Sequence, residues 1–392
     1  MKYLFQLKNG ISILQGEKMF IIILLVLIIG FYLFQTEIYS RKCFDNVFLK
    51  VAFKDTGVFE NDHTELIETV GNKKWLILWY LIVEFKTSKN LLFKGNSSVD
   101  VSVSDASYKK DLFSLSSYQM VKRRFDIVAS RRGYYTIKKA DLMTGDLFGK
   151  YRFLMDLPVS ASLYVYPRLV SDTELSVPFR RMMGEILSKE RLMEDPFLIR
   201  DIRDYMEYDS LKTINWNASA KSGELKVNEY DYTSSKEVKI LMNIEKFNEW
   251  DGDGTIEEGI RIAATIAAEC IKTGIPVQLD SNAGSLLSNG RITVEKSGSP
   301  DYTISFYRQL ACIDTKNVLE PFAETLKEES LRLDKQPLYV LISQYFGKDL
   351  QDEVESFRQE GFNLYWIVPK YPDTKLKVDD ESDMFVWEVT EK

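Results

Sequence analysis

The sequence predicts a multidomain protein with an N-terminal transmembrane helix, an all-β sandwich and a three-layer α/β domain. Three observations predict this order: a long uncharged run near the N-terminus, short alternating apolar runs after it, and buried strands that alternate with helices in the second half. The 392 residues are enough for two or three domains. We expect an N-terminal segment at 1–45 with the helix at about 19–36, the sandwich at 46–166, a linker at 167–199 and the α/β domain at 200–392.

The composition excludes several classes of function. The 51 basic and 58 acidic side chains give a net charge of −7, and no block of Lys and Arg stands out, so nucleic acid is not an expected partner. His63 is the only histidine, which leaves too little material for a Ser-His-Asp relay or a histidine-rich metal cage. The three cysteines, Cys43, Cys270 and Cys312, are odd in number and far apart, which argues against a zinc ribbon or a disulfide scaffold. We therefore expect no cofactor.

The uncharged run covers residues 19–34 and lies between Glu17-Lys18 and Glu37. As a helix it rises about 24 Å, slightly less than the roughly 30 Å of a hydrocarbon core, and its polar flanks make a span feasible. A cleavable signal peptide is the alternative, but the residues after Phe34 are too bulky for a cleavage site. A buried soluble helix is the other alternative, and it fits poorly because the run has no polar face. We expect an uncleaved membrane anchor.

Basic residues near the span indicate its orientation weakly. They are Lys2, Lys8 and Lys18 before the span and Arg41, Lys42, Lys50 and Lys54 after it. The slight excess on the C-terminal side favours a cytoplasmic soluble part, and unpaired cysteines agree with a reducing compartment. We expect a single-pass protein of the cell membrane.

The segment from about 47 to 165 is predicted to be the sandwich. A second apolar run at 75–85 is too short to span a membrane and contains Glu84, so it is expected to be a buried strand. Shorter runs at 99–103, 125–128 and 134–137 are separated by Gly, Asn, Ser and Lys clusters. Short strands at this spacing, without a long amphipathic helix, are typical of a β-sandwich.

The last part of the chain is predicted to be a parallel sheet covered by helices on both faces. The expected order is strand 238–244, helix 255–273, strand 275–279, helices 301–314 and 318–333, strand 338–342, helix 348–359 and strand 363–368. Thr255 and Glu258 have the spacing of a capping box at the start of the first helix, and Gly274 is its expected stop.

The densest charged segment is 200–231. Asp209 or Ser210 is expected to cap a short helix, followed by an edge strand at 225–230. The helix would place Leu211, Ile214 and Ala218 on one face. Trp216 lies off that face, where we expect it to wedge against a neighbouring element.

This segment resembles the signature of the family known as domain of unknown function 58. The matching residues are Arg203, Tyr205, Asp209, Lys212, Ile214, Asn215, Trp216, Ala220, Leu225, Val227 and Glu229. Upstream, residues 131–135 with 146–149, and then 163–167, are similar to two further elements of the family in the same order. The sequence departs from the family pattern at Lys212, where Arg is usual, and a lysine would not make the same bidentate contact.

The resemblance implies a membrane anchor, a β-sandwich and a von Willebrand factor type A-like domain, which is a three-layer α/β fold. It also implies a MoxR-type AAA+ ATPase as partner and a role in the assembly or maturation of other proteins, without enzymatic activity. The signature residues would then be structural or would bind the partner.

Type A domains that bind metal carry Asp-x-Ser-x-Ser after the first central strand, because a hard divalent ion takes carboxylate and hydroxyl oxygens. Here Asn243, Glu245 and Phe247 occupy those three positions. We expect no metal at this degenerate site, although Glu245 still offers one carboxylate.

Three functions remain open on the sequence. The leading hypothesis is a membrane-anchored interaction or scaffold protein that acts with a MoxR-type ATPase. The second is a metal-dependent adhesive receptor with an extracellular type A domain. The third is a hydrolase that uses carboxylates around Asp209 as an acid and a base.

Overall fold

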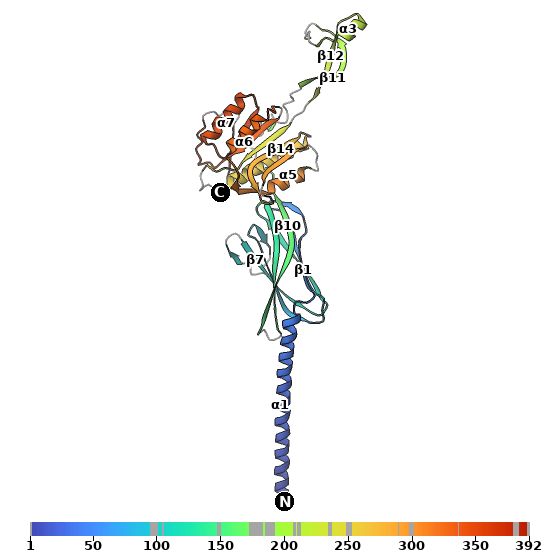
Figure 1. The fold of residues 1–392 in the computed structure, drawn as a ribbon, viewed down its shortest axis with the longest axis vertical. Helices are drawn as coiled ribbons and strands as arrows, with labels where there is room; N and C mark the ends of the chain where they lie inside the picture. Colours follow the sequence, from blue (N-terminus) through green and yellow to red (C-terminus); the bar gives the residue numbers. More distant parts are fainter. Residues whose placement is uncertain are drawn as a thin grey trace. The chain divides into compact units, whose positions relative to one another are not determined.

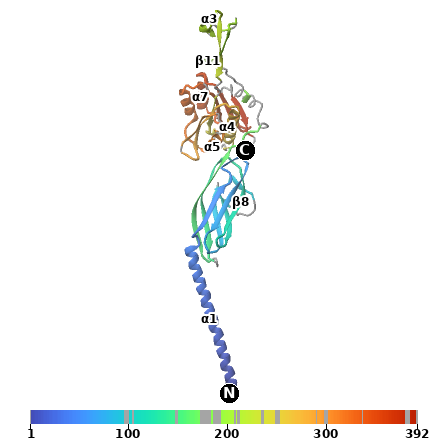
Figure 2. The same cartoon turned by 90° about the vertical axis from the view of Figure 1, so that its right-hand side faces the viewer.

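The structure of the chain is a computed structural model that forms two compact units, Met1–Val165 and Tyr166–Lys392. Figures 1 and 2 show the elements of each unit from two sides. The described residues are 2–94, 101–103, 106–146, 150–171, 183–184, 193–206, 209, 213–233, 237–247, 253–288, 290–297, 302–335, 337–378 and 384–389.

The first unit begins with one long helix, α1 (Lys2–Lys42). Its part from Met19 to Lys42 is long and apolar enough to cross a membrane, with a mean hydropathy of 2.6. Only 6% of this part is buried, so its apolar side chains face outward rather than into a protein core. This outward apolar surface distinguishes α1 from the core helix of a soluble protein, and it is compatible with membrane anchoring.

In the described part of this unit, ten strands follow in two sheets, and they confirm the predicted sandwich. The strands are β1 (Val47–Phe53), β2 (Gly57–Phe59), β3 (His63–Asn72), β4 (Leu78–Ser88), β5 (Leu91–Phe93), β6 (Val101–Val103), β7 (Ala106–Leu115), β8 (Met120–Ala129), β9 (Gly133–Gly145) and β10 (Arg152–Tyr166). One sheet has the order β1-β3-β8-β5, and the other has the order β2-β10-β9-β4-β7-β6. Alternate residues of both sheets, such as Leu66, Val83 and Leu142, form the core between them.

The strand pairing brings three turns to the end of the sandwich where α1 enters. Val47 pairs with Asn72, so β1 starts beside the end of β3, and Leu78 pairs with Leu115. The turns β3–β4, β7–β8 and β9–β10 therefore lie at one end. We call this end the helix end and define it by residues 73–77, 116–119, 146 and 150–152. Lys74, which is 6% exposed, donates from Nζ to the carbonyl of Cys43 at 2.8 Å and so ties this end to α1.

The second unit contains a seven-stranded sheet of order β15-β14-β13-β17-β18-β19, with β16 paired to β14. Its strands are β13 (Val238–Asn243), β14 (Val277–Ser285), β15 (Arg291–Ser297), β16 (Ile313–Val318), β17 (Leu338–Ser343), β18 (Leu364–Lys370) and β19 (Met384–Glu388). Its helices are α4 (Gly254–Lys272), α5 (Tyr302–Ala311), α6 (Phe322–Leu331) and α7 (Lys348–Gln359). Strands β14, β13, β17, β18 and β19 are parallel, whereas β15 and β16 run antiparallel to β14.

Helices cover both faces of this sheet (Figure 1). Leu241 of β13 packs with Phe322 of α6 and Phe357 of α7 on one face. On the other face, α4 lies close enough that a Cβ on Gly259 would meet the side chains of Met242 and Ile342 at 3.1 Å. A larger residue at Gly259 would push α4 away from the sheet.

Several sequence-based assignments in this unit are wrong in detail. Strands β15, β16 and β19 were not expected, and residues 313–314, assigned to a helix, begin β16. The expected capping box does not form, because Thr255 donates to Oε1 of Gln344 and Glu258 pairs with Arg261 at 2.9 Å. Glycine does follow the helix as expected, since Gly274 has φ +75°.

Between β10 and β13 in the sequence, β11 (Met193–Asp204) and β12 (Lys226–Thr233) form a separate two-stranded antiparallel sheet. It carries the short helix α3 (Trp216–Ser222) between its strands. Residues 193–199 of the predicted linker at 167–199 belong to β11, whereas 172–182 and 185–192 lie outside the described residues. The charged side chains of residues 193–199 led to the prediction of an irregular linker instead of a strand.

Candidate functional site

The signature residues gather on the β11–β12 hairpin. Arg203 donates from both terminal nitrogens to the two carboxylate oxygens of Asp209, at 2.7 and 2.6 Å. The backbone N–H of Met206 donates to the same carboxylate at 2.8 Å. The Arg203 guanidinium and then this N–H hold the pKa of Asp209 below its usual range. Asp209 thus closes a turn and does not cap α3, which corrects the expectation from sequence.

Asn215 caps α3 instead. Its Oδ1 accepts from the N–H of Ala218 at 2.9 Å, and its Nδ2 donates to Oδ1 of Asn228 on β12 at 2.6 Å. Ile214 is buried and bridges to Val227. Asn215 and Ile214 therefore fasten α3 to the hairpin through both polar and apolar contacts.

The remaining signature positions are less tightly held. Trp216 is 68% exposed, so the expected wedge against a neighbouring element is wrong. Leu225 is 45% exposed and Ala220 is exposed, while Tyr205 donates its N–H to the Leu225 carbonyl at 2.9 Å. The backbone of Glu229 pairs with that of Asp201, and Lys212 lies outside the described residues.

Among the described side chains of this hairpin, Asp209 and Asp204 do not share a site for acid-base chemistry. Asp209 is bound by Arg203, whereas Asp204 is bound by Lys226. Each of these two carboxylates has its own cation. Lys226 and Asp204 connect β12 with β11, whereas Arg203 and Asp209 close the turn after β11. A pair that shares a proton would need the two carboxyl groups side by side.

The second candidate site is the carboxyl edge of the parallel sheet, where β13, β14 and β17 end. Asn243 is 1% exposed and is the last residue of the buried strand β13. Its Nδ2 donates to Oγ of Ser343 at 3.0 Å, and its Oδ1 accepts from Nδ2 of Asn282 and from the N–H of Glu245, both at 2.9 Å. Asn282 in turn accepts from the N–H of Ile244 at 3.0 Å. These neutral groups satisfy one another and join three strands.

Glu245 has a structural partner at this edge. Its Oε2 accepts from the N–H of Phe322, the first residue of α6, at 3.0 Å. The residue at the N-cap of α6 is Pro321, which makes no side-chain cap of its own, so the carboxylate comes instead from the segment that follows β13. Burial raises the pKa of the Glu245 carboxyl, and the Phe322 N–H opposes that rise.

Phe247 gives the carboxyl edge an apolar surface. Its ring stacks on Phe346 with centroids 4.3 Å apart, and Tyr345 lies 6.4 Å away. Phe247 nevertheless remains 45% exposed. Val318 and Leu319, which lead into α6 at the same edge, are 43% and 42% exposed. Hydrophobic side chains at this exposure suit contact with another protein better than a buried core.

These residues do not fit a divalent metal site. The amide of Asn243 bonds to Ser343 and Asn282, Glu245 caps α6, and Phe247 has no ligand atom. In addition, Nζ of Lys246 lies 2.7 Å from Asp253, which places a cation beside the position. Among the described residues, no three His, Cys, Asp or Glu side chains are grouped so as to hold a metal ion.

The sequence reasoning did not identify Asn282, Ser343 and Gln344 as members of this edge. Gln344 donates from Nε2 to the carbonyl of Glu245 at 3.2 Å and accepts from Thr255. A usable signal existed, because Ser281 is the last residue of β14 that pairs with β13, and Ser343 ends β17 as Asn243 ends β13. Since carboxyl ends of parallel strands meet at one edge, these positions had to converge.

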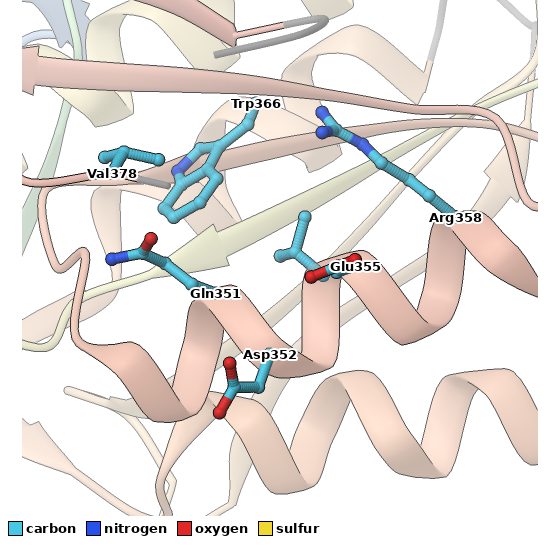
Figure 3. A pocket seen from close by; sticks show the side chains of 7 residues that line it. Gln351, Asp352, Glu355, Arg358, Trp366 and Val378 are labelled. Carbon is cyan, nitrogen blue, oxygen red and sulfur yellow. The ribbon is translucent and has the colours of Figure 1, made fainter. Parts of the chain in front are cut away.

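Two cavities in the described part of the chain differ widely in size. Figure 3 shows a pocket lined by α7 and by Trp366 and Val378, with Asp352, Glu355 and Arg358 around it. Its volume of about 30 Å³ matches one water molecule. A larger hollow of about 460 Å³ lies on the sandwich, where β4 and β9 separate beyond the Phe85–Ala140 pair. Neither cavity holds a recognisable catalytic group.

Comparisons with known proteins add only structural similarity. No family model matches the chain, and no curated protein matches it. The chain is similar to the CARDB domain of PF1109 from Pyrococcus furiosus (16% identity, TM-score 0.18), covering 31% of this chain and 97% of that one. A non-cellulosomal cohesin from Archaeoglobus fulgidus is 7% identical, with a TM-score of 0.21, over 32% of this chain and 94% of that one. The major pilin SpaD from Corynebacterium diphtheriae is 11% identical, with a TM-score of 0.23, over 30% and 34% of the two chains.

Proposed function

We propose that this protein is a membrane-anchored, non-enzymatic interaction or scaffold protein of the domain of unknown function 58 type. Its α/β part would be a von Willebrand factor type A-like domain. The observation that carries the proposal is the carboxyl edge of the sheet. Asn243 and Glu245 there bond to the protein itself, while Phe247 remains in contact with solvent. Such an edge is suited to holding a partner rather than to coordinating an ion or reacting with a substrate.

The proposed partner is a MoxR-type AAA+ ATPase, and the shared task is the assembly or maturation of other proteins. The sequence resemblance supports this partner. In the proposal, α1 crosses the membrane once and the soluble part lies on the cytoplasmic side, where ATP is available. Phe247, Val318 and Leu319 would form the contact surface, because they are the exposed apolar side chains described above at the carboxyl edge.

Photo-crosslinking tests this proposal. A benzophenone amino acid replaces Phe247 in the full chain, expressed in its native cells and extracted in detergent after illumination. We expect an ATPase of the MoxR type among the crosslinked products. Ile304, which is 52% exposed on α5, is the matched control. Because Val277 pairs with Ser297 just before α5, Ile304 lies toward the opposite edge of the sheet. Crosslinks to other proteins but to no AAA+ ATPase would contradict the partner.

Two measurements separate this proposal from the alternatives. A metal-dependent adhesive receptor should gain thermal stability with calcium or magnesium, whereas we expect a change in melting temperature of less than about 1 °C because the ligand atoms are occupied.

A reporter fused after the last residue should be active in the cytoplasm for the proposed protein and outside it for the receptor. Activity of the fused reporter outside the cell would overturn the proposed orientation.

A further inference from the structure

The helix end of the sandwich carries exposed aromatic side chains on all three of its turns. Trp75 lies in the β3–β4 turn, Tyr118 lies in the β7–β8 turn and Tyr151 precedes β10. Trp79, the second residue of β4, directly adjoins the helix end. The exposed fractions of the four side chains, in this order, are 57%, 72%, 44% and 51%. We call these four residues the aromatic collar. Tryptophan and tyrosine favour the boundary between lipid and water, because the ring is apolar while its N–H or O–H requires a polar partner.

Helix α1 is bound to this same end without an intervening linker. Gln35 is 7% exposed, and its Nε2 donates to Oδ2 of Asp146 at 3.4 Å. One turn later, Tyr39 is 4% exposed and donates from its hydroxyl to the Ile77 carbonyl at 2.5 Å. The helix continues unbroken through both residues. The sandwich therefore begins to cover α1 at Gln35.

The length of the apolar run places this junction at a membrane surface. The run ends at Phe34, directly before the covered Gln35, so no polar spacer separates them. Its 16 residues rise about 24 Å, less than the roughly 30 Å of hydrocarbon. The charged pair Glu17-Lys18 limits a shift of the helix in the other direction. A span this short draws the groups at its ends into the headgroup layer.

The charges at the junction complement an anionic surface. Over residues 37–45 and the helix end, the exposed basic side chains are Arg41, Lys42, Lys73, Lys150 and Arg152, and the exposed acidic ones are Glu37 and Asp45. Glu37 is already paired with Arg41 at 2.5 Å. Nζ of Lys150 lies 5.4 Å from the ring centre of Tyr151, so a cation and a collar ring are adjacent. Basic residues beside interfacial aromatics are the combination that binds anionic lipid headgroups.

We propose that the helix end of the sandwich is a lipid-contacting surface, with the aromatic collar seated in the headgroup layer of an anionic bilayer. This rests on the proposed membrane anchor and extends it. The sandwich would then be fixed on the membrane in one orientation, instead of being tethered by a flexible segment. Such a fixed orientation would hold any bound partner at a defined height above the bilayer.

Site-directed fluorescence on the full chain tests this surface. The native cysteines Cys43, Cys270 and Cys312 are buried, so introduced cysteines can be labelled selectively. Tyr118→Cys is labelled with a polarity-sensitive fluorophore and reconstituted in anionic nanodiscs that contain nitroxide lipids. We expect a blue shift of emission and at least about threefold stronger quenching than for Leu92→Cys, estimated from the contrast between interfacial and aqueous positions. Leu92 is 51% exposed on β5 and pairs with Val128, toward the opposite end of the sandwich.

A third label separates failure of this surface from failure of the anchor. Ile28→Cys, at a position of α1 that is 56% exposed, should be quenched deep in the bilayer. Quenching at Ile28 with none at Tyr118 would overturn the collar and leave the anchor standing. Absence of quenching at Ile28 would contradict the proposal that α1 crosses the membrane. Equal quenching at Tyr118 in zwitterionic and anionic discs would overturn the preference for anionic lipid.

Discussion

The interior of the sandwich and the carboxyl edge of the α/β sheet both bury polar side chains, but they satisfy them differently. At the carboxyl edge, Asn243, Asn282 and Ser343 are neutral, at most 1% exposed, and hydrogen-bonded to one another. In the sandwich, by contrast, two ionisable side chains, Glu68 and Lys109, are fully buried. Neither carboxyl oxygen of Glu68 has a hydrogen-bond partner.

The buried charges of the sandwich are held together mainly by one cation, Lys109. Nζ of Lys109 lies 3.1 Å from Asp111 and 3.6 Å from the ring centre of Phe125. Arg123, which is partly exposed, is 3.7 Å from the other Asp111 oxygen. Neutral amides that pair with each other cost little to bury, whereas buried charges are tolerated only while their partners remain. The comparison teaches that the sandwich should respond strongly to loss of one charge and to pH, and the carboxyl edge only weakly.

Removing the central cation should give the largest effect. Lys109→Met keeps the length of the side chain but leaves the buried Asp111 carboxylate with only Arg123 to compensate its charge. We expect a loss of about 4 kcal/mol in the free energy of unfolding of the sandwich, by calorimetry of the detergent-solubilised chain. Lys110→Met is the control, because Lys110 is on the same strand, is half exposed and lies 3.9 Å from Glu84. Equal losses of unfolding free energy in the two variants would show that burial of the cation does not decide the stability of the sandwich.

The pH dependence should be the next largest effect. Burial, and then the charge of Asp111, raise the pKa of Glu68 from 4.5 to about 8, against the opposing charges of Lys109 and Arg123. Below pH 4.5, Glu68 is protonated in both the folded and unfolded states. Between pH 4.5 and 8 the unfolded chain releases the proton while the folded sandwich keeps it, so stability falls as pH rises to about 8.

Glu68→Gln should remove that fall. At pH 9 we expect the variant to be more stable than the parent by on the order of 3 kcal/mol, and at pH 4 to be nearly equal to it. Melting temperatures across this pH range measure the difference. Glu65→Gln, on the same strand beside Lys54 at the surface, is the control. A gain for Glu68→Gln that is the same at pH 4 and pH 9 would mean that the carboxyl is not the titrating group.

The sequence predicted the periodic elements better than the irregular ones. The helix α7 matches the predicted 348–359, because its apolar residues recur at helical spacing between clear ends. Strands β15 and β16 were missed because each is short, runs antiparallel at the side of β14 and has largely exposed or half-buried side chains. In β15 only Ile292 and Val294 alternate with polar residues, and β16 has a single buried hydrophobic residue, Ile313, so neither pattern is long enough to predict a strand.

The candidate site was predictable only where contacts are local. Asn215 and α3 are neighbours in sequence, yet Asp209 seemed the better cap, since its pairing with Arg203 depends on the turn that closes after β11. At the carboxyl edge, the sequence alone indicated that Asn243 and Phe247 differ from the Asp and Ser expected at a metal site. The partners of Asn243, which are Asn282 and Ser343, come from strands 39 and 100 positions away, so only the order of strands in the sheet reveals them.

The smallest expected effect concerns the carboxylate at the carboxyl edge and sharpens the same comparison. Glu245→Ala removes the acceptor for the first N–H of α6, and Pro321 offers no replacement. We expect a loss of about 1 kcal/mol and faster hydrogen exchange at Phe322 than in the parent, because only one helix-end hydrogen bond disappears. Glu324→Ala, an exposed acidic residue in the first turn of the same helix, is the control and should change exchange at Phe322 little. A loss as large as that of Lys109→Met would show that Glu245 supports the whole edge and that the carboxyl edge, like the sandwich, depends on a single charge.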